Sequence, residues 1–109
     1  MYYIKKTLEI SASHRVTIGQ DGECEDPHGH NWIIVVYCKS ENLTENGMVV
    51  DFNDIKRIVR SKLDHKNLNE VLAFNPTAEN IAKWVVDNVP HCYRATVQET
   101  RDNEASYEL

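Results

Sequence analysis

Two helical patterns stand next to each other in the middle of the chain, and strand-like segments lie before and after them. The first covers residues 52–63, where Asp51 is placed to cap the helix and apolar residues recur at helical spacing. The second opens at Pro76-Thr77, with Thr77 as its cap, and ends at Pro90. Helices that are grouped, and do not alternate with strands, favour an α+β protein in which two helices cover one face of an antiparallel sheet.

The segments that flank the helices have the composition of strands. Residues 30–38 are rich in β-branched and aromatic side chains, which predicts a buried strand. The other expected strands are residues 2–10, which a turn or bulge can interrupt, and residues 48–50, 94–100 and 105–109. Residues 19–27 and 41–47 have the composition of a loop and of a turn.

The size and charge of the chain exclude several classes of protein. Its 109 residues fit one domain, 1–109, with a modest core that oligomerisation would supplement. A formal net charge of −5 argues against nucleic acid or an anionic membrane as the main partner. The longest apolar run, Trp32–Cys38, is far shorter than the roughly 18 residues of a membrane span. Three cysteines without a Cys-x-x-Cys pair indicate reduced thiols and a cytoplasmic location.

The most specific chemical feature is the tripeptide His28-Gly29-His30 at the start of the apolar strand. Side chains two residues apart on a strand point to the same face, so both imidazoles can bind one metal ion. His14, at the end of the first strand, would supply a third imidazole. Three neutral nitrogen ligands with an open fourth position are typical of catalytic zinc. The alternative is a pair of surface histidines at a turn.

Four other residues are candidates for a site, each with an ordinary alternative. Cys24, four residues before His28, is either a reactive thiolate, a further zinc ligand or a lone thiol in an acidic loop. Asp64-His65 follows the first helix and is either an acid–base pair or an ordinary helix end. Glu99 in the last alternating strand is either an acceptor for two parallel N–H donors of a ligand or a solvated strand residue.

Taken together, these motifs stand in an order that resembles the 6-pyruvoyl-tetrahydropterin synthase family, above all its 6-carboxy-tetrahydropterin synthase branch. The matching segments cover nearly the whole chain: Ser11-Ala12-Ser13-His14-Arg15, Cys24-x-x-x-His28-Gly29-His30-Asn31, Gly47-Met48-Val49-Val50-Asp51-Phe52, Leu63-Asp64-His65-Lys66-Asn67-Leu68-Asn69, Pro76-Thr77-Ala78-Glu79-Asn80-Ile81-Ala82 and Glu99-Thr100.

The resemblance implies the tunnelling fold (T-fold), a four-stranded antiparallel sheet with two helices on one face. Three subunits of this fold close a barrel, and two trimers stack into a homohexamer. The resemblance also implies a role for each candidate residue: zinc ligands (His14, His28, His30), a proton-abstracting thiol (Cys24), a catalytic pair that acts in a neighbouring subunit's site (Asp64, His65) and a pterin-anchoring carboxylate (Glu99).

The implied activity is that of a zinc-dependent lyase acting on 7,8-dihydroneopterin triphosphate. In the queuosine branch the products are 6-carboxy-5,6,7,8-tetrahydropterin, acetaldehyde and triphosphate. Two sister branches form 6-pyruvoyl-tetrahydropterin or, with a Glu in place of the Cys, a folate precursor. Retention of Cys24 four residues before His28 favours the queuosine branch, while Glu23 and Glu25 leave a Glu-dependent activity open. An alternative of another class is a non-catalytic zinc- or pterin-binding protein on the same fold.

Overall fold

The computed structural model describes residues 1–19 and 22–109. Its strands and helices follow in the order β1 (Tyr2–His14), β2 (Thr17–Ile18), β3 (Glu23–Cys24), β4 (His28–Ser40), α1 (Phe52–Leu63), β5 (Lys66–Asn67), α2 (Leu68–Val71), α3 (Ala78–Asn88), β6 (Cys92–Thr100) and β7 (Asn103–Glu108). The expected α+β order, with helices grouped between strands, is confirmed.

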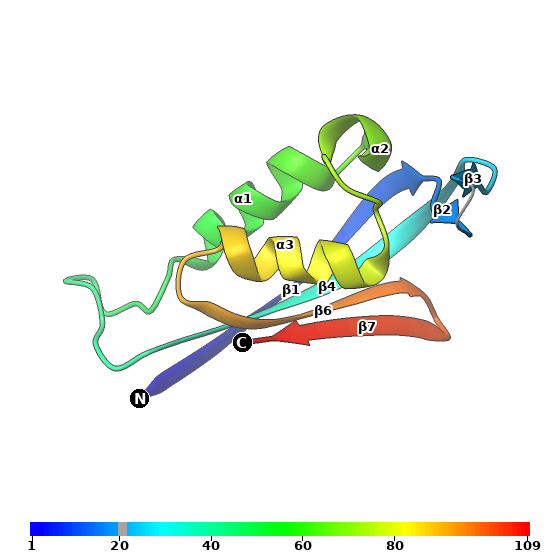
Figure 1. Cartoon of the computed structure of the whole chain (residues 1–109). Helices are drawn as coiled ribbons and strands as arrows, with labels where there is room; N and C mark the ends of the chain where they lie inside the picture. The colour runs from blue at the N-terminus through cyan, green and yellow to red at the C-terminus, as the bar shows by residue number, and fades with distance from the viewer. Residues whose placement is uncertain (20–21) are drawn as a thin grey trace.

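One sheet, in the order β5-β1-β4-β6-β7, forms the base of the molecule (Figure 1). Strands β1, β4, β6 and β7 are antiparallel, as expected. The expected count of four is corrected by β5, which adds two residues in parallel beside β1. α1 and α3 cover the same face of this sheet, where α1 packs on β1 and α3 packs on β6 and β7 (Figure 1).

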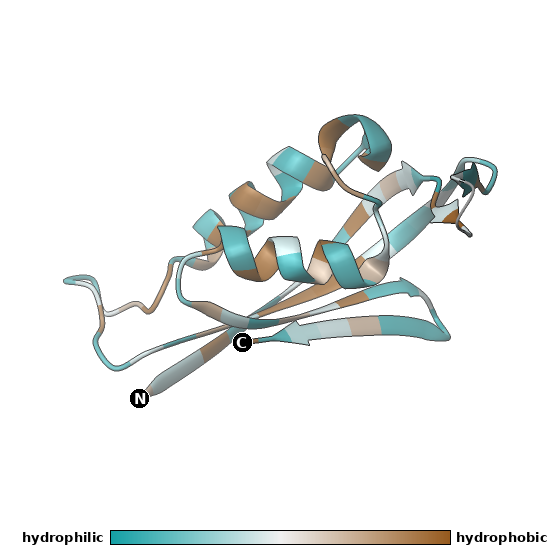
Figure 2. Ribbon diagram, viewed as in Figure 1, coloured by the Kyte–Doolittle hydropathy of each residue, from teal (hydrophilic) through white to brown (hydrophobic). Residues whose placement is uncertain are grey.

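The two long helices begin where their caps predicted. The Asp51 side chain accepts the N–H of Asn53, and the Thr77 side chain accepts the N–H of Asn80. Each cap satisfies one of the backbone donors that the first turn of a helix leaves free. Their apolar faces point to the sheet (Figure 2), and the buried helix residues are Ile55, Val59, Leu63, Ala78, Ile81, Ala82, Val85 and Val86.

Two expectations about strands were wrong. β1 runs without interruption from Tyr2 to His14, because it pairs residue by residue with β4 from Tyr2↔Ser40 to His14↔His28. Residues 48–50 form no strand, since residues 49 and 50 lie in a bend, although Val49 is buried in the core. An apolar loop residue can therefore fill the core without a strand partner.

The expected loop over residues 19–27 contains part of a small hairpin in which Thr17 pairs with Cys24. Residues 20–21 of this loop lie outside the described part of the chain. Within the described residues, no helix is both long and apolar enough to cross a membrane.

Candidate metal centre

Three histidines meet where β1 ends and β4 begins. His14 is the last residue of β1, and it pairs directly with His28, the first residue of β4. His30 lies two residues further along β4, so its side chain points to the same side as that of His28. The sequence predicted this shared face for His28 and His30, and the antiparallel register brings His14 beside them.

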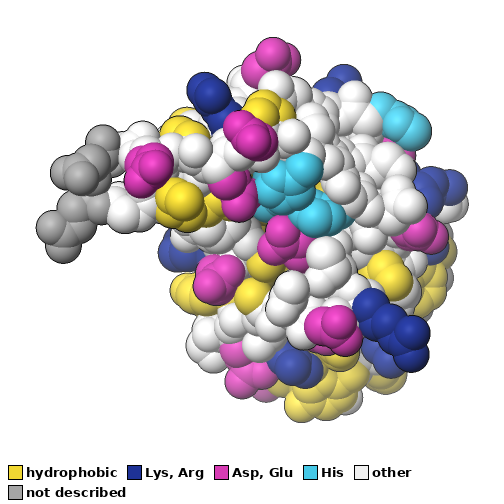
Figure 3. All heavy atoms as spheres, turned by 90° about the vertical axis from the view of Figure 1, so that its right-hand side faces the viewer, with side chains coloured by type: hydrophobic (Ala, Val, Ile, Leu, Met, Phe, Trp, Pro, Cys, Tyr) yellow, Lys and Arg dark blue, Asp and Glu magenta, His cyan; other side chains and the backbone are white. Residues whose placement is uncertain are grey.

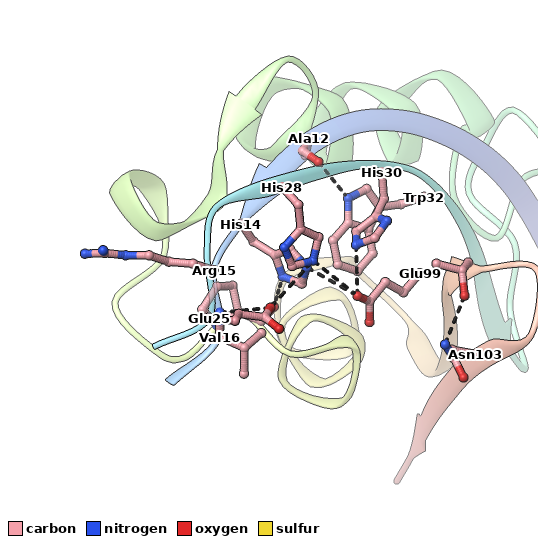
Figure 4. Close-up of polar contacts among 12 residues, drawn as sticks. Ala12, His14, Arg15, Val16, Glu25, His28, His30, Trp32, Glu99 and Asn103 are labelled. Carbon is pink, nitrogen blue, oxygen red and sulfur yellow. Dashed lines mark hydrogen bonds and ion pairs between the residues drawn. The ribbon is translucent and has the colours of Figure 1, made fainter. Parts of the chain in front are cut away.

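The ring nitrogens of these histidines converge on one carboxylate (Figure 4). Nε2 of His14 and Nε2 of His28 are 3.1 Å apart. Oε1 of Glu99, which comes from β6, lies 2.9 Å from His30 Nε2, 3.3 Å from His14 Nε2 and 3.9 Å from His28 Nε2. All four ligand atoms lie within 4.8 Å of one another.

Backbone carbonyls fix the protonation of two of the rings. Nδ1 of His14 lies 2.8 Å from the carbonyl oxygen of Pro76, and Nδ1 of His28 lies 2.9 Å from that of Asp26. A carbonyl only accepts, so each Nδ1 carries the proton and each neutral ring presents a lone pair at Nε2. This second hydrogen bond is the usual support of a metal-bound histidine.

The floor of the site is Trp32, which is fully buried. Its ring packs edge-on against His14 at 4.8 Å and against His30 at 5.3 Å between centroids. Its indole N–H donates to the carbonyl oxygen of Ala12 at 3.1 Å. The sequence analysis did not assign Trp32 to the site, although its spacing from His28 and His30 on one strand places it on the same face.

Burial and the neighbouring charged groups both act on the pKa of His30. Burial lowers the pKa of His30, and the neighbouring rings of His28 and His14 lower it further, while Glu99 acts in the opposite direction. Nε2 of His30 is buried and faces the carboxylate oxygen of Glu99 at 2.9 Å. In Figure 3, acidic side chains lie beside the histidine side chains at the centre of this face. The donor set, three imidazoles and a carboxylate, fits a divalent metal such as zinc.

The other predicted site residues lie outside this four-residue cluster. Cys24 is exposed on β3, where its thiol lies 3.5 Å from the Thr17 hydroxyl. Asp64 accepts the backbone N–H of Ser11 at 2.9 Å, so it braces β1. The ring of His65 is 82% exposed, and its Nε2 lies 3.6 Å from Asp64 Oδ2.

His65 has an unusual backbone conformation for a residue that is not glycine. Its φ is 57°, and its N–H donates to the carbonyl of Ser11 at 2.7 Å. Left-handed backbone of this kind costs free energy and is found preferentially at functional sites. The turn after α1 leaves the His65 ring exposed.

The fold and this centre define a class: an α+β protein whose sheet carries a candidate metal site of three imidazoles and one carboxylate. The family model of 6-pyruvoyl tetrahydropterin synthase matches residues 3–109. The chain belongs to this family, as its motifs predicted.

Curated relatives carry different names. The 6-carboxy-5,6,7,8-tetrahydropterin synthase of Synechocystis sp. is 34% identical over 121 residues, which cover 98% of this chain and 93% of the relative. The human 6-pyruvoyl tetrahydrobiopterin synthase is 30% identical over 129 residues, which cover 95% of this chain and 89% of the relative. The structure of Caenorhabditis elegans 6-pyruvoyl tetrahydropterin synthase matches with a TM-score of 0.75 and 26% identity, covering 98% of this chain and 94% of that one. This is the T-fold expected from the sequence.

Proposed function

We propose that the protein is a zinc-dependent lyase of queuosine biosynthesis. It converts 7,8-dihydroneopterin triphosphate into 6-carboxy-5,6,7,8-tetrahydropterin, acetaldehyde and triphosphate. The observation that carries the proposal is the convergence of His14, His28 and His30 on one point, in a chain of this family. The similarity to a 6-carboxy-tetrahydropterin synthase over nearly the full chain supports the choice of branch.

The three histidines would hold zinc through their Nε2 atoms. A bound zinc ion supplies Lewis-acid chemistry, polarising substrate oxygens and making the neighbouring C–H bonds more acidic. The carbonyls of Pro76 and Asp26 keep His14 and His28 in the tautomer that binds a metal.

Glu99 is proposed to anchor the pterin. Its carboxylate is 27% exposed, so part of it is open to a ligand. It also lines a depression beside the histidines together with Glu79, Asp102 and Glu104. The 2-amino-pyrimidinone end of a pterin presents two parallel N–H donors, which a carboxylate can accept as it accepts an arginine.

Cys24 and His65 are proposed to move protons. Cys24 is exposed on the hairpin that leads into His28, and its thiolate would remove a proton from the substrate side chain. His65, supported by Asp64, is exposed and is not one of the four clustered residues. It would therefore serve the site of a neighbouring subunit, in a homohexamer made of two stacked trimers.

Two related activities compete with this one. Formation of 6-pyruvoyl-tetrahydropterin is favoured by the similarity to the human enzyme. Formation of a folate precursor is favoured by the carboxylate of Glu25, 3.5 Å from His28 Nε2. A non-catalytic zinc- or pterin-binding protein is the alternative outside enzymes, and the presence of Cys24, Asp64 and His65 speaks against it.

Product analysis tests the proposal. Zinc-loaded protein is incubated with 7,8-dihydroneopterin triphosphate, and pterins and acetaldehyde are identified by mass spectrometry. Carboxy-tetrahydropterin with acetaldehyde is the expected result, and Cys24→Ala should abolish it. A pyruvoyl or hydroxymethyl pterin would move the protein to a sister branch. Unchanged substrate with protein that holds zinc would contradict the enzymatic assignment.

A further inference from the structure

Two of the three cysteines lie directly opposite each other on neighbouring strands. Cys38, near the end of β4, pairs with Cys92, the first residue of β6. Both are free thiols in the buried core, where Cys38 has no exposed surface and Cys92 is 6% exposed. The roles proposed for the site residues use neither of them. Two thiols that face each other across a pair of strands can form a disulfide if they come close enough.

A one-residue bulge in β6 places these cysteines opposite each other. Tyr37 of β4 pairs with Arg94 of β6. The next pair along β4 is Cys38 with Cys92, which leaves Tyr93 outside the register. In an unbroken ladder Cys38 would face Tyr93 instead. A bulge re-aims side chains in this way, and here it brings both cysteine side chains into the core between the same two strands.

The backbone hydrogen bonds show how close the two residues come. The N–H of Lys39 donates to the carbonyl of His91 at 3.0 Å. Lys39 and His91 therefore form a hydrogen-bonded pair, so the adjacent pair of cysteines is of the non-hydrogen-bonded kind. In such a pair the Cα atoms are about 4.5 Å apart and the side chains are at their closest. This separation lies within the range of about 4.4–6.8 Å that a disulfide needs.

The two thiols differ in how readily they ionise. The Cys38 thiol hydrogen-bonds with the sulfur of Cys92, and this contact lowers the pKa of Cys92, against the effect of burial. The same contact raises the pKa of Cys38, and burial raises it further. A thiolate is the nucleophilic form of cysteine. Cys92 is therefore both the better nucleophile and the only one of the two sulfur-bearing residues with exposed surface.

We propose that Cys38 and Cys92 form a redox pair, which a peroxide joins in a reversible disulfide. The Cys92 thiolate attacks one oxygen of hydrogen peroxide, the O–O bond breaks, and the sulfur becomes a sulfenic acid while the leaving hydroxide is protonated to water. The Cys38 sulfur then attacks the sulfenic sulfur, and its proton leaves with the hydroxyl group as a second water. The two sulfurs together lose two electrons, and the peroxide gains them.

The disulfide would close a segment of the chain that carries all three helices. α1, α2 and α3 lie between residues 38 and 92, so the bond would join the two strands from which the helical layer departs and to which it returns. Such a bond stabilises a protein chiefly by restricting its unfolded chain. The four clustered residues of the candidate metal centre lie outside this segment, so the inference does not depend on the proposed function.

The test uses the whole chain with Cys24→Ser, because the exposed Cys24 thiol would otherwise consume peroxide and link two molecules. The folded, reduced protein is treated with hydrogen peroxide, the remaining thiols are blocked with iodoacetamide in denaturant, and the protein is digested with trypsin. Mass spectrometry should find residues 16–39 joined to residues 84–94, the two peptides that contain the cysteine pair. Dithiothreitol should restore both thiols, and oxidation should raise the melting temperature by about 10 °C.

Two double variants are the matched controls, Cys24→Ser combined with either Cys38→Ser or Cys92→Ser. Without Cys38, dimedone should trap a sulfenic acid at Cys92, whereas without Cys92 the Cys38 thiol should stay reduced. Absence of the joined peptides, at a peroxide concentration that fully oxidises Cys24 in the wild type, would overturn the inference. Joined peptides with a lowered melting temperature would also overturn it, because the bond would then form only in an opened chain.

Discussion

Replacing Trp32 by Phe should destabilise the protein and weaken the metal centre at the same time. The buried indole N–H donates to the carbonyl oxygen of Ala12. A phenyl ring cannot donate, so this acceptor loses a partner at a cost of about 1–3 kcal/mol. The smaller ring also leaves unfilled volume beside His14 and His30, which adds about 1 kcal/mol. The expected loss in free energy of unfolding is about 2–4 kcal/mol.

Urea unfolding followed by far-UV circular dichroism measures this loss, and Co²⁺ titration measures the effect on the site. Trp84→Phe is the matched control, because Trp84 is half-buried on α3, whereas the tryptophan ring that packs against His14 and His30 is that of Trp32. It should cost about 1 kcal/mol or less. Trp32→Phe should lower metal affinity about 10-fold, because the rings it supports gain freedom. Equal losses of stability in the two variants, with unchanged metal affinity in both, would refute the supporting role of Trp32.

Three further results are expected. In the native protein a thiol reagent should modify Cys24 rapidly and the buried Cys38 and Cys92 only after unfolding; rapid reaction of a second thiol would contradict the described core. Thr77→Ala should cost about 1 kcal/mol in urea unfolding, because the first turn of α3 loses its cap, and Thr77→Ser should restore it. If Thr77→Ala kept the free energy of unfolding of the wild type, the cap would not be needed. Burial lowers the pKa of His30, so the unfolded chain binds more protons and the metal-free protein should lose stability as the pH falls below about 6.5. The melting temperature of His30→Gln should depend less on pH over this range. If it depended on pH as that of the wild type does, a group other than His30 would cause the loss of stability.

The starts of the two long helices could be predicted to the residue because their signals are local, whereas the short helix α2 (Leu68–Val71) was not predicted. Asp51 and Thr77 cap through side chains two or three residues away from the groups they bind. The strands depend on partners that are distant in the sequence. β1 is longer than its composition indicated because β4 pairs with it throughout, and residues 48–50 lack a partner and form no strand.

The residues of the candidate site also fall into two groups: those that local spacing predicts and those that only contacts between distant segments bring together. The spacing of His28 and His30 is enough to place both rings on one face. His14 joins them only through the register of two antiparallel strands, and Glu99 arrives from β6, more than sixty residues later in the sequence. Convergence of this kind is a property of the tertiary structure.

The central claim is that His14, His28 and His30 form a metal centre, with Glu99 beside it. The most direct measurement is the zinc content of purified protein by elemental mass spectrometry, in the wild type and in His28→Ala. His28 is the most exposed of the three histidines, so its replacement disturbs the core least. We expect about one zinc ion per chain in the wild type and almost none in His28→Ala, with both proteins folded. Equal zinc content in the two proteins would contradict the site described here.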